Sequence, residues 1–150
     1  LLAAGEIDAI LGSRRPDSLG KHPDVVRLFP DYRKIERDFY QRTQIHPIMH
    51  VIAIRRDVYD KDPWITASLY QAFDAAKDWA LARLRISGAQ HSMLPFQFAD
   101  MDEVDELFGG DPWPYGIEPN RPTLEALVRH LHEQHFIRDV MPIEDLFVAV

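Results

Sequence analysis

Apolar residues recur every three or four positions in several parts of the chain, and this spacing predicts helices with one buried face. The longest predicted helix begins at Asp62 and Pro63, because an acidic cap and a proline in the first turn are typical of a helix start. Its predicted buried face contains Ile65, Leu69, Ala72, Phe73, Ala76, Trp79 and Ala80. This helix is therefore expected to be a core element.

Four further segments have weaker helical signals. Residues 101–108 are predicted to form a helix that is capped by Asp100 and ends at two glycines. Another helix is predicted to start near Pro122, and a last short one at Pro142. Residues 32–42 have charges and aromatic side chains at roughly helical spacing, which allows either one short helix or extended turns.

Three apolar runs, at residues 6–11, 25–29 and 48–54, are typical of short strands. The run at 48–54 has the strongest signal, since β-branched residues dominate it and it lies between Pro47 and the charged Arg55. Strands that alternate with helices predict an α/β architecture, with helices packed on a mixed sheet. In such sheets ligands bind beyond the carboxyl ends of the strands.

The start of the chain resembles the end of a helix. Residues 1–4 are followed by Gly5, and glycine commonly closes a helix in the left-handed conformation. A domain seldom begins in the final turn of a helix, so we expect the chain to begin inside a larger protein. The 150 residues themselves suffice for one domain, 1–150.

Composition and charge exclude several classes of function. The formal net charge of −7 gives no basic field that would attract nucleic acid or an anionic membrane surface. No apolar run approaches the ~20 residues of a membrane helix, and the first residues lack the features of a signal peptide. Cysteine is absent, which excludes disulfides and thiolate metal sites and fits a cytoplasmic protein.

His46 lies just before the predicted strand at 48–54, and His50 lies within it. His46 and His50 have the spacing of a helical zinc pair, but in a strand four residues span about 13 Å, too far for two ligands of one ion. Either histidine could instead protonate or contact an anionic substrate, because histidine titrates near neutral pH. The alternative is that both are structural residues beside a buried strand.

Arginines supply the candidate anion-binding groups. Arg14 and Arg15 follow the predicted strand at 6–11, and an arginine pair can hold a carboxylate through two hydrogen bonds. A chain of net charge −7 that binds a dianion needs such local cations, and Arg55 is a further candidate. Tyr115 lies in a loop rich in Pro, Gly and aromatic residues, which favours either a binding loop or a cover over the edge of the core.

The chain as a whole is similar to the carboxyl-terminal half of the 4,5-dihydroxyphthalate decarboxylase family. The similarity lies in six segments taken in order, namely GEIDAIL, VVRLFPD, TQIHPIMHVIAIRRDVY, DPWITASLYQAFDAAKDWA, DPWPYGIEPNR and LEALVRHLHEQHFI. The most specific of these are HPIMHVIAIRRDVY and DPWPYGIEPNR. That family resembles, in turn, the fold of periplasmic binding proteins of type II, which consists of two lobes with the ligand in the cleft between them.

The resemblance implies that residues 1–150 are the carboxyl-terminal portion of such a two-lobed protein, with the amino-terminal remainder of the same protein as a partner. It also implies an enzyme, a carboxy-lyase that removes one carboxylate from a dihydroxylated phthalate and gives protocatechuate and carbon dioxide. We expect no cofactor and no metal, because no spacing in the chain demands one.

The chemistry of this reaction suggests roles for the candidate residues. We hypothesise that His50 or His46 donates the proton to the ring carbon, and that Arg14 or Arg15 holds the carboxylate that stays. Tyr115 would then hydrogen-bond a ring hydroxyl, and Arg55 would add positive charge to the substrate-binding site.

A second class of function fits the same resemblance. Solute-binding proteins of ABC transporters use this fold to hold small organic anions and perform no chemistry. Such a receptor would need a secretory or lipoprotein signal and would return its ligand unchanged. Assembly into a homo-oligomer is compatible with either function.

Overall fold

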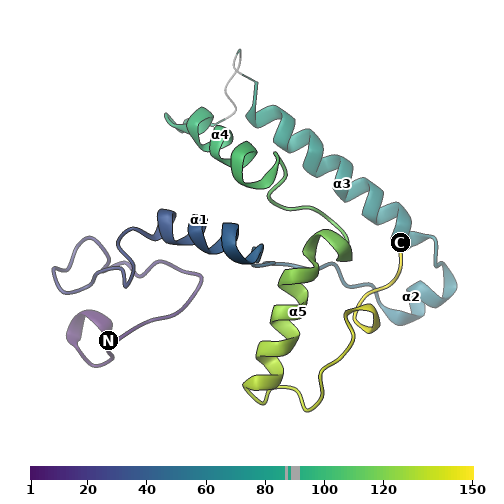
Figure 1. Cartoon of the computed structure of the whole chain (residues 1–150), viewed down its shortest axis with the longest axis horizontal. Coiled ribbons are helices and arrows are strands. Elements are labelled where there is room, and N and C mark those ends of the chain that lie inside the picture. Colours follow the sequence, from purple (N-terminus) through teal and green to yellow (C-terminus); the bar gives the residue numbers. More distant parts are fainter. Residues whose placement is uncertain (87, 89–91) are drawn as a thin grey trace. The chain divides into compact units, whose positions relative to one another are not determined.

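The computed structural model describes residues 1–86, 88 and 92–150 (Figure 1). Its contacts divide the chain into two compact units, Leu1–Asp38 and Phe39–Val150, and each unit is described by itself. The helix α1, Tyr32–Thr43, belongs partly to each unit.

Unit 1, Leu1–Asp38, consists mainly of turns. It begins with a short 3₁₀ helix, η1, Leu2–Ala4, which ends at Gly5 in the left-handed conformation with φ 70°. The predicted helical turn before Gly5 is therefore confirmed. Among residues 1–38, all of which the structure describes, Val25 is the buried apolar side chain, at 7% exposure.

Unit 2, Phe39–Val150, contains the remaining helices. These are α2 (Arg56–Lys61), α3 (Ile65–Leu84), α4 (Gln97–Phe108), α5 (Ile117–Glu133) and the 3₁₀ helix η2 (Ile143–Asp145). Its core forms where α5 meets η2, and consists of Leu124, Val128 and Ile143, with Ile117, Ile137 and Phe147 packed against them. The end of α3 is tied to α4, since the side-chain amide of Gln97 donates to the carbonyl oxygen of Leu84 at 2.6 Å.

The predicted α/β architecture is wrong for this chain. No strand occurs in residues 1–86, 88 and 92–150, and the helices do not pack on a mixed sheet. Residues 6–11 and 25–29 form bends and irregular backbone, and residues 48–54 carry no regular structure. A strand forms only when its backbone N–H and C=O groups pair with a neighbouring strand. The β-branched run at 48–54 has the local preference for a strand but no such pairing, and Val51 remains 67% exposed.

Most of the predicted helices are confirmed, but their predicted first residues differ from those in the structure. The long helix is α3, and residues 32–42 do form a helix, α1. The predicted buried face of α3 is wrong, however, because Phe73 is 43% and Trp79 63% exposed and Leu81 is its buried side chain. α4 begins at Gln97 rather than 101, so Asp100 lies inside its first turn and is not the cap. α5 begins at Ile117 and contains Pro122, although proline at that position has no N–H to donate back along the helix.

The helix α2 was not predicted, because Arg55 and the charged residues after it were interpreted only as the end of a strand. None of the helices in the described ranges is long and apolar enough to cross a membrane.

Candidate functional site

The candidate site is a hollow of about 290 Å³ in unit 1. Its lining residues combine three arginines with small and apolar side chains, and they are Ile10, Gly12, Ser13, Arg14, Arg15, Pro16, Leu19 and Arg27. The lining includes no aspartate or glutamate. The structure therefore places the two predicted residues Arg14 and Arg15 in the same hollow and adds Arg27 to them.

The arginines of this hollow lack the acidic partners that Arg55 and Arg85 have. In unit 2, Arg55 forms an ion pair with Asp57 at 2.5 Å, and Arg85 forms one with Asp105 at 2.5 Å. By contrast, no ion pair joins Arg14, Arg15 or Arg27 to a carboxylate anywhere in the described ranges. Three unneutralised guanidinium groups around one hollow make it a local positive site in a protein of net charge −7.

A hydrogen bond orients Arg15. Its Nη2 atom donates to the carbonyl oxygen of Leu19 at 3.0 Å. The next residue, Gly20, has φ +80°, and a Cβ atom there would lie 3.3 Å from Nη2 of Arg15. Glycine suits the left-handed backbone at position 20, and a Cβ atom there would displace the guanidinium of Arg15 slightly. The turn after Arg15 holds this side chain in a defined direction.

Arg27 was missed by the sequence analysis. Its guanidinium carbon lies 4.5 Å from the centre of the Tyr32 ring, in a cation–π contact. The residue stands in the apolar run 25–29, which was interpreted as a strand, so its charge gave no separate signal. Arg27 becomes a candidate only because the folded chain places it in the lining of the hollow together with Arg14 and Arg15.

His46 is held by packing and by its backbone, within unit 2. Its ring makes edge-on contacts with Tyr40, at 6.1 Å between ring centres, and with Phe108, at 5.0 Å. The hydroxyl oxygen of the buried Thr123 accepts a hydrogen bond from the His46 N–H at 3.1 Å, and the same hydroxyl donates to the His46 carbonyl oxygen at 3.2 Å. The residue is half-buried, and these contacts hold both its ring and its backbone in place.

His50 and Arg55 lie farther along the same irregular segment. The His50 side chain is exposed. Arg55 makes two hydrogen bonds to the carboxylate of Asp57, at 2.9 and 2.5 Å, and these lower the pKa of Asp57 below its usual range. The positive charge of Arg55 is thus already matched by a neighbouring carboxylate, which makes it a weaker candidate for binding an anion.

Tyr115 packs against α3. Its ring lies 6.1 Å from the ring of Tyr70, and the ammonium group of Lys77 lies 5.1 Å from its centre. The four predicted residues of unit 2, His46, His50, Arg55 and Tyr115, therefore have different sets of neighbours. The aromatic loop covers part of α3, which is the structural alternative that its composition allowed.

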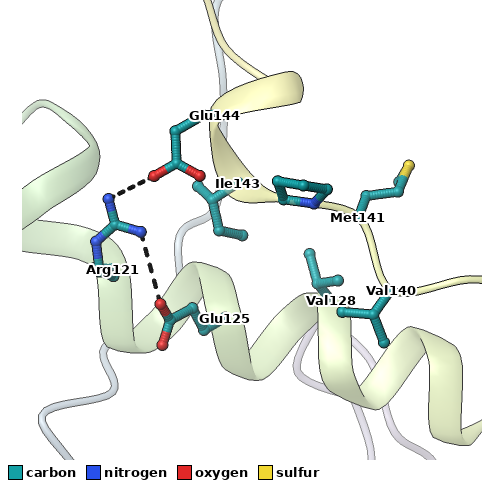
Figure 2. Close-up of a pocket in the computed structure, with 8 residues that line it drawn as sticks. Arg121, Glu125, Val128, Val140, Met141, Ile143 and Glu144 are labelled. Carbon is teal, nitrogen blue, oxygen red and sulfur yellow. Dashed lines mark hydrogen bonds and ion pairs between the residues drawn. The ribbon is translucent and has the colours of Figure 1, made fainter.

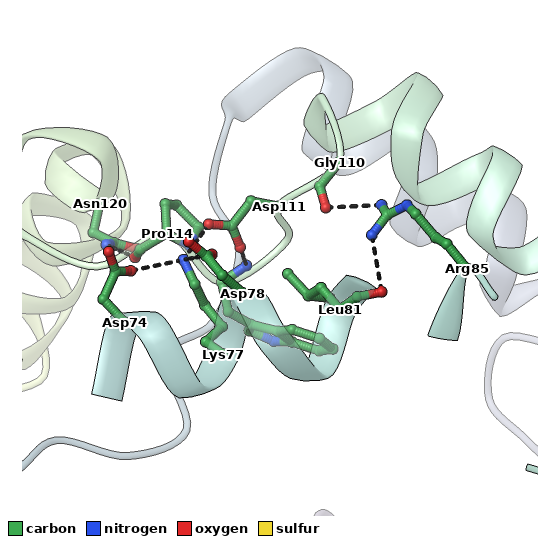
Figure 3. A network of polar contacts seen from close by, with 10 residues as sticks. Asp74, Lys77, Asp78, Leu81, Arg85, Gly110, Asp111, Pro114 and Asn120 are labelled. Carbon is green, nitrogen blue, oxygen red and sulfur yellow. Dashed lines mark hydrogen bonds and ion pairs between the residues drawn. The ribbon is translucent and has the colours of Figure 1, made fainter. Parts of the chain in front are cut away.

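Lys77 is the centre of the polar network that holds this loop (Figure 3). Its ammonium group donates to Asp111, and it pairs with Asp74 at 3.1 Å and with Asp78 at 3.7 Å. The Lys77 side chain is only 12% exposed. Burial by itself would lower the pKa of Lys77, but the hydrogen bonds to Asp111 and Asp74 outweigh it and raise that pKa above its ordinary value.

Replacing Lys77 by methionine should lower the free energy of unfolding by about 1–3 kcal/mol at pH 7, since it leaves Asp74 and Asp111 without their shared cation. The raised pKa of Lys77 means that its stabilisation is fully present below pH 10.5 and is lost only as the pH rises through the higher folded value. Urea unfolding of the variant measures the loss. Lys61→Met, at an exposed lysine at the end of α2, is the matched control and should change stability by less than about 0.5 kcal/mol. Equal stability of the two variants would contradict the role given to Lys77.

A second hollow, of about 350 Å³, lies between α5 and η2 (Figure 2). Arg121 lines it and pairs with Glu118 at 2.5 Å, Glu144 at 2.7 Å and Glu125 at 3.6 Å. Hydrogen bonds to Arg121 lower the pKa values of Glu118 and Glu144. With three carboxylates around one guanidinium, this hollow does not suit an anionic ligand. In the ranges that the structure describes, no group of three or more His, Asp or Glu side chains could hold a metal ion.

Comparison with known proteins confirms the resemblance to the 4,5-dihydroxyphthalate decarboxylase family, which was recognised from the sequence. The relative found is 4,5-dihydroxyphthalate decarboxylase of Comamonas testosteroni, to which the chain is 34% identical over 135 residues. These residues make up 89% of this chain and 41% of the relative, so the chain spans about two fifths of the relative's length. No family model matches the chain.

Proposed function

We propose that this chain contributes the anion-binding site of a decarboxylase that converts 4,5-dihydroxyphthalate, or a closely similar aromatic dicarboxylate, to protocatechuate and carbon dioxide. The observation that carries the proposal is the hollow in unit 1, where three arginines without acidic partners meet. The similarity to a 4,5-dihydroxyphthalate decarboxylase supplies the reaction and the substrate class.

The lining of the hollow matches the two kinds of surface on such a substrate. Carboxylates suit the guanidinium groups of Arg14 and Arg15, which can each donate two parallel hydrogen bonds. The faces of a ring suit apolar side chains, and Ile10, Pro16 and Leu19 supply these. The volume of about 290 Å³ lies just below the range of small-molecule sites, which is ~300–1,000 Å³. A single aromatic ring with small substituents is a ligand of this scale.

The reaction breaks the bond between a ring carbon and its carboxylate. A proton first adds to that ring carbon while the ring supplies the electron pair for the new C–H bond. The bond to the carboxylate then breaks, its electron pair returns to the ring and restores aromaticity, and carbon dioxide leaves. An ionised hydroxyl para to this carbon can feed electrons into the ring and is restored when the product forms. The protein therefore has to hold the remaining carboxylate and to supply one proton.

For each residue by itself, we keep as a proposal the role that the sequence suggests. Arg14 or Arg15 binds the carboxylate that stays, and His50 or His46 donates the proton. Tyr115 donates a hydrogen bond to a ring hydroxyl, and Arg55 adds positive charge. The packing of His46 and the pairing of Arg55 with Asp57 make His50 and the arginines of the hollow the stronger members of this set.

Other parts of the sequence interpretation stay predictions. They are that residues 1–150 form the carboxyl-terminal domain of a larger two-lobed protein, that the rest of that protein is a partner, that copies assemble into a homo-oligomer, and that the protein is cytoplasmic. The absence of nucleic acid and membrane partners also stays a prediction.

The test is release of carbon dioxide from the intact protein incubated with 4,5-dihydroxyphthalate. Phthalate, which lacks both hydroxyls, is the control substrate and should release none, because its ring cannot supply electrons in the same way. One molecule of protocatechuate should form for each molecule of carbon dioxide that is released. Tight binding of the dicarboxylate without any carbon dioxide, with and without a chelator, would instead favour a solute-binding protein and would contradict the enzyme.

A further inference from the structure

We propose that Arg27 is the residue that makes the hollow in unit 1 selective for a dicarboxylate over a monocarboxylate. This inference rests on the proposed function, since it assigns a specificity residue to the same site. It goes further in giving separate tasks to the arginines: Arg14 and Arg15 hold one carboxylate, and Arg27 holds the other.

The position of Arg27 in the chain supports this division. The other residues that line the hollow lie in one continuous stretch, 10–19, whereas Arg27 comes from a separate part of unit 1, twelve residues after Arg15. A phthalate has two carboxylates on neighbouring ring carbons and cannot bring both to one guanidinium while it keeps two parallel hydrogen bonds there. A second carboxylate therefore needs a second guanidinium. Arg27 is the arginine of this lining that comes from a segment apart from the adjacent Arg14 and Arg15.

The contact with Tyr32 holds Arg27 without neutralising it. The guanidinium carbon lies 4.5 Å from the ring centre, so the aromatic face restricts the side chain. A carboxylate in the same position would cancel the charge, as Glu118 does for Arg121. An aromatic ring leaves both the charge and the edge of the guanidinium free for a ligand. Arg27 is thereby preorganised for an anion.

The segment that carries Arg27 is anchored close by. Val25 is buried, at 7% exposure, and its N–H donates to the carbonyl oxygen of His22 at 3.2 Å. Two residues later Arg27 is exposed. The buried Val25, the Tyr32 ring against the guanidinium and the exposed charge of Arg27 together support a role in binding.

The experiment measures the dissociation constants of phthalate and benzoate by calorimetry, using the intact protein. These two ligands differ by one carboxylate and lack the hydroxyls that decarboxylation requires, so binding is measured without turnover. Arg27→Gln should weaken phthalate binding by about tenfold or more and benzoate binding by less than about threefold. Arg129→Gln removes the same charge from an exposed position on α5, outside the hollow, and should change neither constant by more than about twofold.

A pair of variants at position 32 tests the orienting contact. Tyr32→Phe keeps the ring and should keep the preference for phthalate, whereas Tyr32→Leu removes the ring and should reduce that preference several-fold. If Arg27→Gln weakens phthalate and benzoate by the same factor, or weakens neither, the selectivity role is overturned. A wild-type protein without any preference for phthalate overturns it too.

Failure of the proposed function gives a different result. In that case the wild-type protein would release no carbon dioxide from 4,5-dihydroxyphthalate, while the preference for phthalate and its loss in Arg27→Gln would still support the specificity role. Conversely, normal carbon dioxide release with unchanged selectivity in Arg27→Gln would overturn this inference alone.

Discussion

Replacing His50 by alanine should lower the turnover of 4,5-dihydroxyphthalate by about 10²–10⁴-fold, the usual loss when a general acid is removed. Carbon dioxide release under saturating substrate is the measurement. The affinity for the substrate should change much less, because His50 is proposed to deliver a proton and not to hold a carboxylate. His50 is exposed and has no packing role that its loss would disturb, so the thermal midpoint should stay close to that of the wild-type protein.

His46→Ala is the necessary comparison. The ring of His46 packs against Tyr40 and Phe108, so its removal should lower stability even if it has no part in the chemistry. His46→Phe keeps a ring in that space and removes only the ionisable group. If His46→Phe loses turnover and His50→Ala does not, the proton donor is His46. Near-normal turnover in both variants would show that the acid lies elsewhere.

The pH dependence of turnover gives an independent check on the histidine. A general acid must carry its proton and the para hydroxyl must be ionised when the reaction begins. Turnover should therefore fall at low pH, where the hydroxyl is protonated, and again at high pH, where the acid has lost its proton. In the variant that has lost the donor, this alkaline fall should disappear from the remaining activity. An unchanged profile in the slow variant would mean that the lost histidine supported the site in another way.

The helices could be predicted from the sequence because their signals are local. The apolar repeat in α3 and the glycine after α4 each require only neighbouring residues, and Gly109 does adopt φ 65° at the end of α4. The start of α5 was misplaced because Pro122 was interpreted as a first-turn residue, although the helix already begins at Ile117. Proline is common at helix starts but does not mark them uniquely.

The strands could not be predicted in the same way, because a strand is defined by its partner. Residues 48–54 have the composition of a strand, and their side chains remain largely exposed with no paired neighbour. The same reason limits the site. Arg14 and Arg15 were found from their place after an apolar run, but Arg27 joins them only through the folding of residues between 15 and 27. Arg55 forms an ion pair with Asp57, whereas Arg27 contacts the ring of Tyr32. This difference also depends on where the folded chain places the side chains.

Replacing both Arg14 and Arg15 by glutamine should lower kcat/KM for 4,5-dihydroxyphthalate by about 10²-fold or more, since charge-assisted hydrogen bonds to one carboxylate would be lost from both guanidiniums. The single variants Arg14→Gln and Arg15→Gln show which guanidinium makes the larger contribution. Lysine at the same positions keeps the charge but not the planar fork, so it should recover only part of the loss. Steady-state kinetics at two salt concentrations measures these effects, and the wild-type protein should be the more sensitive to salt.

A variant that leaves every arginine in place separates orientation from charge. Gly20→Ala should weaken substrate binding several-fold, because a Cβ atom would crowd Nη2 of Arg15 and alanine resists the left-handed backbone at that position. Gly12→Ala is the matched control, since it also borders the hollow but has open space around its Cβ position and no left-handed backbone. If the two alanine variants bind phthalate equally well, the direction of the Arg15 side chain is unimportant and charge alone attracts the substrate. In the other outcome, only Gly20→Ala binds phthalate weakly, and the double variant Gly20→Ala/Arg15→Gln binds it no more weakly. The turn after Arg15 then acts by orienting that guanidinium toward a carboxylate.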